Sequence, residues 1–285
     1  MNSNGLNQYS RFVTFATFLL IVAGGLVTST GSGLSVPDWP LSYGQLFPPM
    51  LGGIRFEHTH RVIAGIVGFL TLLLAIAVFL VEKRKWVRWL GLTALLAVVA
   101  QAILGGVTVI YLLPTAVSVI HACLAQTFFS LLASLCLVTS KEWKEAPPFG
   151  SGYAVSIQRL FTVTTAFIYL QLIAGAIVRH TKGEGTYYHV TLAFLIAMHL
   201  VFILLKICKE SGLREKFLRP VVFLLGLVVF QITMGFGAFI VTLVLPRTEV
   251  ASTGQVLITT AHQANGALIL ATAVVLTLRS FRWLR

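Results

Sequence analysis

Charged residues are scarce in this sequence: Asp, Glu, Lys and Arg make up 11% of its 285 residues, and only 9 of these are acidic. Hydrophobic residues account for 57%, and the mean hydropathy is +0.89. A soluble domain usually carries about 25% charged residues. The composition therefore excludes an ordinary soluble protein and indicates a chain that lies mostly in hydrocarbon.

Cysteine is rare as well, with only Cys123, Cys136 and Cys208 in the chain. None is placed for a disulfide on the outer side of a membrane, so buried packing is their expected role. A basic stretch ahead of the first apolar run is also lacking, and a long polar loop follows that run. It is therefore predicted to be a retained helix rather than a cleavable signal peptide.

What the sequence does have is long apolar runs. Each has the roughly 20 residues needed to cross about 30 Å of hydrocarbon. There are eight, near residues 12–30, 57–81, 88–110, 117–139, 159–179, 186–207, 218–244 and 256–278. The predicted fold class is an all-α polytopic membrane protein with eight transmembrane helices.

Basic residues are distributed unevenly across the predicted membrane. With the N-terminus inside, the inner segments hold 16 of the 21 Lys and Arg residues. The outer segments hold only Arg55, Arg61, Arg179, Lys182 and Arg247. This positive-inside bias predicts a bacterial-type plasma membrane protein with both termini in the cytoplasm. Orientation and contact with anionic lipid account for the net charge of +12, so no nucleic-acid partner is expected.

The two halves of the sequence share small, Gln and His residues at matching positions. The ends of the first and fifth predicted helices, 23–30 and 174–181, match in small residues and in an exit Thr. Gln101 corresponds to Gln231, and His121 to His262. We expect two four-helix bundles, residues 1–140 and 159–285, joined by a cytoplasmic linker at 141–158. An even number of helices in each makes this a parallel repeat.

Four histidines fall at one depth near the outer surface, one on each even-numbered helix. His60, His121, His189 and His262 precede the next inner charge by 20 or 22 residues, whereas His199 precedes it by only 10. At 1.5 Å per residue, His199 would sit about 15 Å deeper, so it is the alternate to His189. Two imidazoles from facing helices suit the axial positions of a heme better than they suit zinc, which takes three or four ligands. The spacing favours two heme sites.

The first site carries a carboxylate that the second lacks. Glu57, His60 and Arg61 share one helical face, at i, i+3 and i+4. The corresponding positions beside His189 hold Thr186 and Val190. Glu57 either pairs with a neighbouring arginine or acts as a proton acceptor beside a reacting porphyrin.

Two features would make room for a flat ligand and cover it. The helical face that carries His60 continues into the membrane with small residues, namely Ala64, Gly65 and Gly68. The loop of residues 31–56 is long and rich in turn-forming residues. It is either an interfacial cap or a lid over the substrate.

Several segments together resemble one known family: 30–34 (TGSGL), 37–41 (PDWPL), 57–61 (EHTHR) and 179–181 (RHT), with the paired histidines of the fourth and eighth helices. They resemble heme A synthase, the membrane enzyme family of cytochrome oxidase assembly. The resemblance implies heme b in the C-terminal half and heme o as substrate in the N-terminal half. It also implies oxidation of a porphyrin methyl group to a formyl group by successive hydroxylations, with an essential glutamate at the place of Glu57.

On this basis His60 and His121 are expected to hold the substrate iron, and His189 and His262 the heme b. Arg61 and Arg179 are expected to face the heme propionates or the lid. The sequence departs from the family at Ser35 and Ser42, where many bacterial members carry a cysteine pair, and at Val190, where an arginine is expected. No disulfide or redox role is therefore expected for the loop.

Two other functions fit parts of this pattern. A diheme b-type electron-transfer protein linked to quinol would use the same histidines without modifying heme. A transporter would also contain parallel repeats, but no pair of Gly- or Pro-broken helices occurs at mid-membrane. Besides the lipid bilayer, the expected partners are the enzyme that makes heme o and a quinone or other electron acceptor. A homo-oligomer is compatible with the sequence.

Overall fold

The computed structural model describes residues 2–246 and 250–285, and helices account for nearly all regular structure in these residues. Eight helices are long and apolar enough to cross a membrane, which confirms the predicted all-α polytopic class. They are α1 (Ser3–Ser29), α2 (Ile54–Val81), α3 (Lys85–Ile110), α4 (Thr115–Thr139), α6 (Ala154–His180), α7 (Thr186–Ile207), α8 (Ser211–Phe239) with its π-helical extension η1 (Ile240–Val244), and α9 (Thr253–Trp283). The chain is thus a multi-pass membrane protein.

Most of these helices extend several residues beyond the apolar runs. Lys and Arg have high helix propensity, so a helix continues into the charged ends that hydropathy leaves out. The start of α6 at Ala154 lies inside the segment predicted as linker, which also holds the short helix α5 (Lys141–Glu145). Arg247, counted above among the outer basic residues, lies outside the described residues. The expected packing role is wrong for Cys208, which is exposed, whereas Cys123 is buried.

Polar side chains mark several helix starts. Asn2 accepts a hydrogen bond from the backbone N–H of Gly5 at the start of α1, and Ser252 accepts one from Gln255 at the start of α9. Such caps satisfy N–H groups that have no partner within the helix. Ser140 caps α5 in the same way, so the chain turns sharply after α4.

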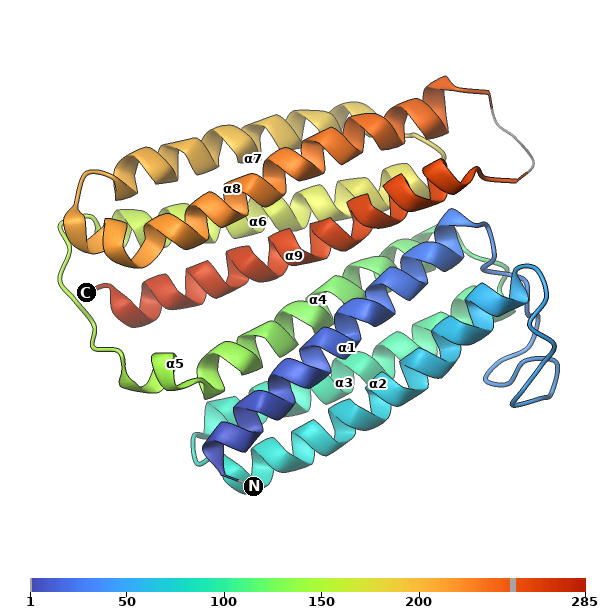
Figure 1. The fold of residues 1–285 in the computed structure, drawn as a ribbon, viewed down its shortest axis with the longest axis horizontal. Coiled ribbons are helices and arrows are strands. Elements are labelled where there is room, and N and C mark those ends of the chain that lie inside the picture. The colour runs from blue at the N-terminus through green and yellow to red at the C-terminus, as the bar shows by residue number, and fades with distance from the viewer. Residues whose placement is uncertain (1, 247–249) are drawn as a thin grey trace.

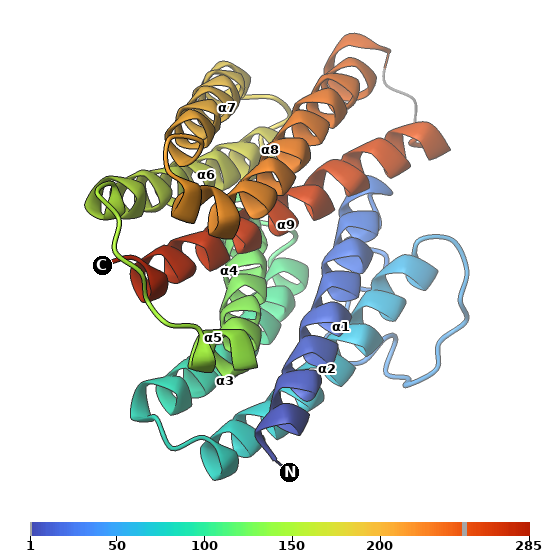
Figure 2. The ribbon, with the colours of Figure 1, turned by 60° about the vertical axis from the view of Figure 1, so that its left-hand side comes forward.

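The helices contact one another in two groups of four. In the first, α1 and α3 each contact both α2 and α4; in the second, α6 and α8 each contact both α7 and α9. Between the groups, α9 contacts α1 and α4, and α4 also contacts α6. Figures 1 and 2 show the two groups side by side. Both termini and α5 lie at one end, here called the linker end, and the loop between α1 and α2 lies at the opposite loop end (Figure 1).

Each group buries its own apolar core, and a smaller cluster joins them. Ile21 of α1, Phe129 of α4, and Ala267 and Ala271 of α9 form that joining cluster. Small residues allow helices in a membrane to approach closely, which suits the two alanines of α9. The contact between the groups places the N-terminal halves of α4 and α9, with their histidines, in neighbouring positions.

Candidate functional site

In the first group, both predicted histidines lie directly against a glycine of the preceding helix. A Cβ atom built on Gly24 of α1 would lie 3.0 Å from Cε1 of His60. A Cβ atom on Gly105 of α3 would lie 3.4 Å from Cε1 of His121. The two imidazoles are close enough to interact electrostatically. An added Cβ would thus be tight against the ring of His60 and in ordinary van der Waals contact with the ring of His121.

The second group repeats this contact. A Cβ atom on Gly175 of α6 would lie 2.8 Å from Cε1 of His189, and one on Gly235 of α8 would lie 3.1 Å from Cε1 of His262. The two rings lie edge to face, with centroids 6.2 Å apart and their planes at 72°. Metal–nitrogen bonds of about 2 Å, plus about 1 Å from each nitrogen to its ring centre, give roughly 6 Å for two imidazoles on one iron. The spacing of this pair thus fits axial ligation of a heme.

Glutamine accompanies three of the four rings, one helical turn before the contacting glycine. The amide nitrogens of Gln101, Gln171 and Gln231 lie 3.5, 3.5 and 3.2 Å from Nε2 of His121, His189 and His262. In α1 the corresponding residue is Leu20, so His60 has no such neighbour at that position. Gln171 was not predicted from the sequence, although the Gln-x-x-x-Gly spacing of α3 and α8 recurs in α6.

The imidazoles are not satisfied by the protein itself. Nδ1 of His60, His121 and His262 is buried without a hydrogen-bond partner, whereas Nδ1 of His189 lies 3.2 Å from the carbonyl of Gln171. A buried polar atom without a partner costs about 1–3 kcal/mol, so packing alone does not explain these rings. Within residues 2–246 and 250–285, no group of three or more His, Cys, Asp or Glu side chains could hold a metal ion. Paired imidazoles fit a heme, not a zinc site.

The alternate histidine, His199, is placed differently. Its ring packs edge-on against Phe167 with centroids 5.9 Å apart, and its Nε2 atom has no hydrogen-bond partner. It is His189, one helical turn from the start of α7, whose ring faces His262. The geometry therefore supports His189 as the partner of His262.

Both carboxylate oxygens of Glu57 are occupied. Oε1 accepts a hydrogen bond from Nη2 of Arg61 at 2.5 Å, and Oε2 accepts one from the backbone N–H of Val36 at 2.9 Å. The residue is only 3% exposed and lies in the first turn of α2, where the helix dipole favours a negative charge. The remaining N–H groups of Arg61 donate to the carbonyls of Val36, Asp38 and Leu41. Glu57 and Arg61 together fix the α1–α2 loop to α2.

Two further contacts hold this loop, called the lid below (residues 31–53). Ser42 Oγ lies 2.8 Å from Nδ1 of His58. The indole of Trp39 covers Gly106 of α3, where an added Cβ would lie 2.8 Å from the ring. The lid is thus fastened to α2 and to α3, next to the first histidine pair.

The lid is also braced internally. The carboxylate of Asp38 accepts hydrogen bonds from the backbone N–H groups of Gly44 and Tyr43, and these bonds lower the pKa of Asp38. Tyr43 and Gly44 both have positive φ, at 54° and 68°. The hydroxyl of Tyr43 donates to the carbonyl of Ser35 at 2.7 Å. Hydrogen bonds thus cross the loop that carries Ser35 and Ser42.

Arg179, at the end of α6, contacts neither Glu57 nor the lid. Its Nη2 atom donates to Ser29 Oγ at 2.9 Å and lies 3.4 Å from the carbonyl of Gly25. Thr259 and Thr260 of α9 also reach Ser29 Oγ, at 2.8 and 3.0 Å. A cation at the C-terminus of α1 interacts favourably with the helix dipole, so Arg179 connects the second group to the first.

The family model described as cytochrome oxidase assembly protein matches residues 7–52 and 54–191 of this chain. The matched residues include the lid, Glu57, Arg61 and three of the four paired histidines, and end before His262. They amount to more than half of the chain.

Individual relatives agree with this match. A heme A synthase of Bacillus pumilus is 29% identical over 186 residues, which are 63% of this chain and 60% of the relative. One from an Exiguobacterium species is 31% identical over 176 residues, 60% of this chain and 57% of the relative. The chain thus spans about 60% of the length of these curated relatives. The match to the family model over α1 to the first turn of α7 shows that this chain belongs to the cytochrome oxidase assembly protein family.

Proposed function

We propose that this protein is a membrane oxidoreductase that converts heme o to heme A. It would oxidise a porphyrin methyl group to a formyl group by successive hydroxylations and so serve the biogenesis of cytochrome c oxidase. The observation that carries the proposal is the pairing of imidazoles, each seated on a glycine and three of the four left with a buried ring nitrogen that has no hydrogen-bond partner. The relatives named heme A synthase support the same reaction.

In this proposal the two histidine pairs have different tasks. His60 and His121 hold the iron of heme o, the substrate, beside Glu57 and under the lid. His189 and His262, whose ring spacing fits one iron, hold heme b. When bound, heme b supplies a one-electron redox centre between the substrate site and an external acceptor, a quinone or another carrier. The asymmetry of the two groups supports this division, because only the first has a buried carboxylate and a long covering loop.

Glu57 is the proposed proton acceptor of the first site. It is buried three residues before His60, on the same helical face. Its carboxylate is hydrogen-bonded to Arg61 and would accept a proton or stabilise positive charge on the substrate. Arg61 would orient Glu57 and hold the lid closed, which excludes water from the methyl group being oxidised. Arg179 would position the second group against the first.

The same proposal includes the arrangement of the chain in the membrane. The identical order of helix contacts in the two groups supports a parallel repeat of residues 1–140 and 159–285. The excess of basic residues at the linker end supports a cytoplasmic location for both termini. The enzyme that makes heme o is a proposed partner, because its product would enter the first site.

The test is to purify the full chain from cells that make heme o, extract the hemes and identify them by mass. We expect low-spin bis-histidine spectra, with heme b together with heme o or heme A. Two bound heme b groups and no heme o or heme A would favour the electron-transfer protein instead. A functional protein without any heme would contradict both and favour the transporter.

A further inference from the structure

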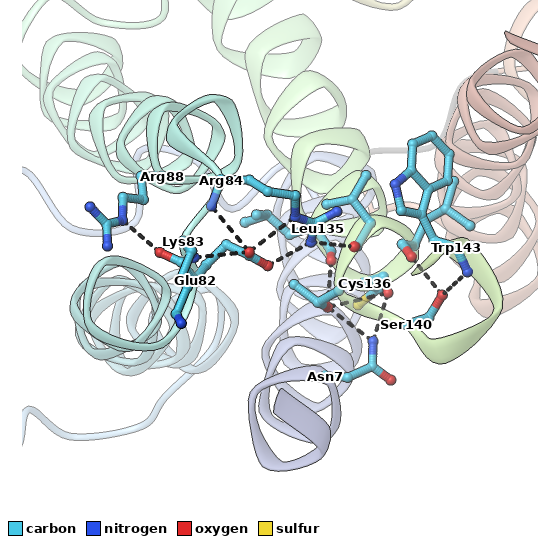
Figure 3. Close-up of polar contacts among 12 residues, drawn as sticks. Asn7, Glu82, Lys83, Arg84, Arg88, Leu135, Cys136, Ser140 and Trp143 are labelled. Atoms are coloured by element: carbon cyan, nitrogen blue, oxygen red, sulfur yellow. Dashed lines mark hydrogen bonds and ion pairs between the residues drawn. The ribbon is translucent and has the colours of Figure 1, made fainter. Parts of the chain in front are cut away.

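At the linker end, a cavity of about 550 Å³ lies where three separate segments meet. The α2–α3 turn contributes Glu82, Arg84 and Trp86, α5 contributes Trp143 and Lys144, and the end of α9 contributes Arg282. Figure 3 shows the polar contacts that fix the α2–α3 turn and the start of α5 to the end of α4. The walls of the cavity therefore belong to both helix groups and to the linker between them.

One of the three cations in the cavity wall is already neutralised. Arg84 donates to both oxygens of Glu82, at 3.0 and 2.5 Å, and to the carbonyl of Val138 at 2.8 Å. These hydrogen bonds lower the pKa of Glu82 to about 2, so the carboxylate is charged and fully engaged. Glu82 is thus paired with Arg84, and the excess positive charge in the wall comes from Lys144 and Arg282.

The other two cations form no ion pair among the described residues. The exposed ammonium group of Lys144 donates no hydrogen bond there, although Lys144 is close enough to Glu82 to help lower the pKa of that carboxyl. Arg282 donates through Nε to the carbonyl of Trp143 at 3.2 Å, and its terminal nitrogens have no partner in that part of the chain. With three cations against one carboxylate, the cavity wall carries a net charge of +2, which favours a ligand with a phosphate group that accepts several charge-assisted hydrogen bonds.

The aromatic residues in the wall indicate where the cavity lies in the bilayer. Trp86 is 49% exposed, and Trp89, one turn further along α3, is 66% exposed. Tryptophan concentrates at the level of the lipid headgroups, where its ring lies in apolar surroundings and its N–H reaches water. Phe79 and Leu80 at the end of α2 are also exposed, at 63% and 75%. A phosphate in the cavity would therefore lie close to apolar surface suited to acyl chains.

We propose that this cavity binds the phosphodiester headgroup of an acidic phospholipid, held by Lys144 and Arg282. Its acyl chains would lie along the exposed apolar residues of α2 and α3. One lipid would then contact the first group, the linker and the second group at once and stabilise their arrangement. Basic pockets between helices at the cytoplasmic surface are suited to such headgroups. The proposal does not depend on the reaction assigned above.

The experiment compares the full chain in phosphatidylcholine nanodiscs with and without phosphatidylglycerol. The variants are Lys144→Gln/Arg282→Gln and the matched control Lys83→Gln/Lys141→Gln. The control removes the same total charge, one Lys from the α2–α3 turn and one from α5, outside the cavity wall. The thermal unfolding midpoint and the phospholipid retained in native mass spectrometry are measured for each.

For the wild type we expect phosphatidylglycerol to raise the midpoint by several degrees, because a ligand of the folded state stabilises it. The cavity variant should lose most of this increase and retain phosphatidylglycerol about tenfold more weakly. The control variant should behave as the wild type. If the double variant does not fold, Lys144→Gln alone, at an exposed position, should show part of the loss.

Three outcomes would overturn the proposal. Equal losses in the cavity and control variants would show that the lipid responds only to the total surface charge. An unchanged midpoint on adding phosphatidylglycerol would show that there is no such site. The same stabilisation by inorganic phosphate in phosphatidylcholine nanodiscs would show that a free anion, not a lipid, is the ligand.

Discussion

The carboxylate of Glu57 accepts a hydrogen bond from the backbone N–H of Val36. The residue proposed to take up a proton therefore also holds the lid in place. In Glu57→Gln an amide oxygen can still accept this bond, but the charge opposite Arg61 is lost. We expect this variant to retain heme and a protected lid while heme A formation stops. Heme extraction and limited proteolysis of the lid are the measurements.

Glu57→Ala should differ from Glu57→Gln, because it also removes the acceptor for Val36. Leaving Arg61 buried without its partner costs about 3 kcal/mol, so the thermal midpoint should fall and the lid should become sensitive to protease. Glu184→Gln, at an exposed site of the same membrane side, is the matched control. Normal heme A formation in Glu57→Gln would show that the carboxylate has no part in the reaction.

Gly175→Ala is expected to disturb the second heme site. Its Cβ would lie 2.8 Å from the ring of His189, closer than a carbon atom tolerates, so the imidazole must move. The low-spin heme b signal should weaken or shift in absorption and electron paramagnetic resonance spectra. Gly226→Ala has nothing within 4 Å of its Cβ and should leave the spectra unchanged, with up to about 1 kcal/mol gained in helix stability. Identical spectra for both variants would contradict the assigned contact.

His189 and His199 can be separated by one pair of substitutions. His189→Ala should remove heme b, because its ring is the one that faces His262 at 6.2 Å. His199→Ala removes an edge-on contact with Phe167 and should lower stability by about 1 kcal/mol without changing heme content. The heme-to-protein ratio after purification decides between them, and the reverse result would make His199 the ligand.

The Glu82–Arg84 pair should make stability depend on pH only in acid. Hydrogen bonds from Arg84 lower the pKa of Glu82 from 4.5 to about 2. A carboxyl whose pKa is lower in the folded than in the unfolded protein stabilises the folded state fully at pH values above its unfolded-state pKa. This stabilisation is lost as the pH falls through its folded-state pKa. The midpoint difference between wild type and Glu82→Gln should therefore stay constant from neutral pH to about 5 and vanish towards pH 2. Glu215→Gln, whose side chain is 74% exposed, should show little difference at any pH.

Much of the fold could be predicted because hydropathy and helical period act over long apolar segments. The eight helices and the matched depth of His60, His121, His189 and His262 depend only on residue spacing along such segments. The proximity of Glu57 and Arg61 also follows from their i, i+4 spacing. For this reason an ion pair with arginine was one of the two roles predicted for Glu57.

The irregular lid could not be predicted in this way. The contacts of the lid are made by backbone groups, such as the N–H of Val36 and the carbonyls around Arg61. Nearly every residue has these groups, so the sequence does not show which of them bind. The placing of Trp39 on Gly106 depends on the course of the whole loop. The cavity at the linker end combines Lys144 with Arg282, which are brought together only by the packing of α9 against α4.

The contacts of Ser29 determine how closely the two helix groups approach each other at the loop end. A single hydroxyl oxygen at the end of α1 is approached by Arg179 of α6 and by Thr259 and Thr260 of α9. Because Ser29 is small, side chains of α6 and α9 fit around this oxygen, so a bulkier residue here would push the second helix group away from α1. In the proposed function this would lengthen the path between the two heme sites, and electron transfer between them would slow because tunnelling falls off steeply with distance.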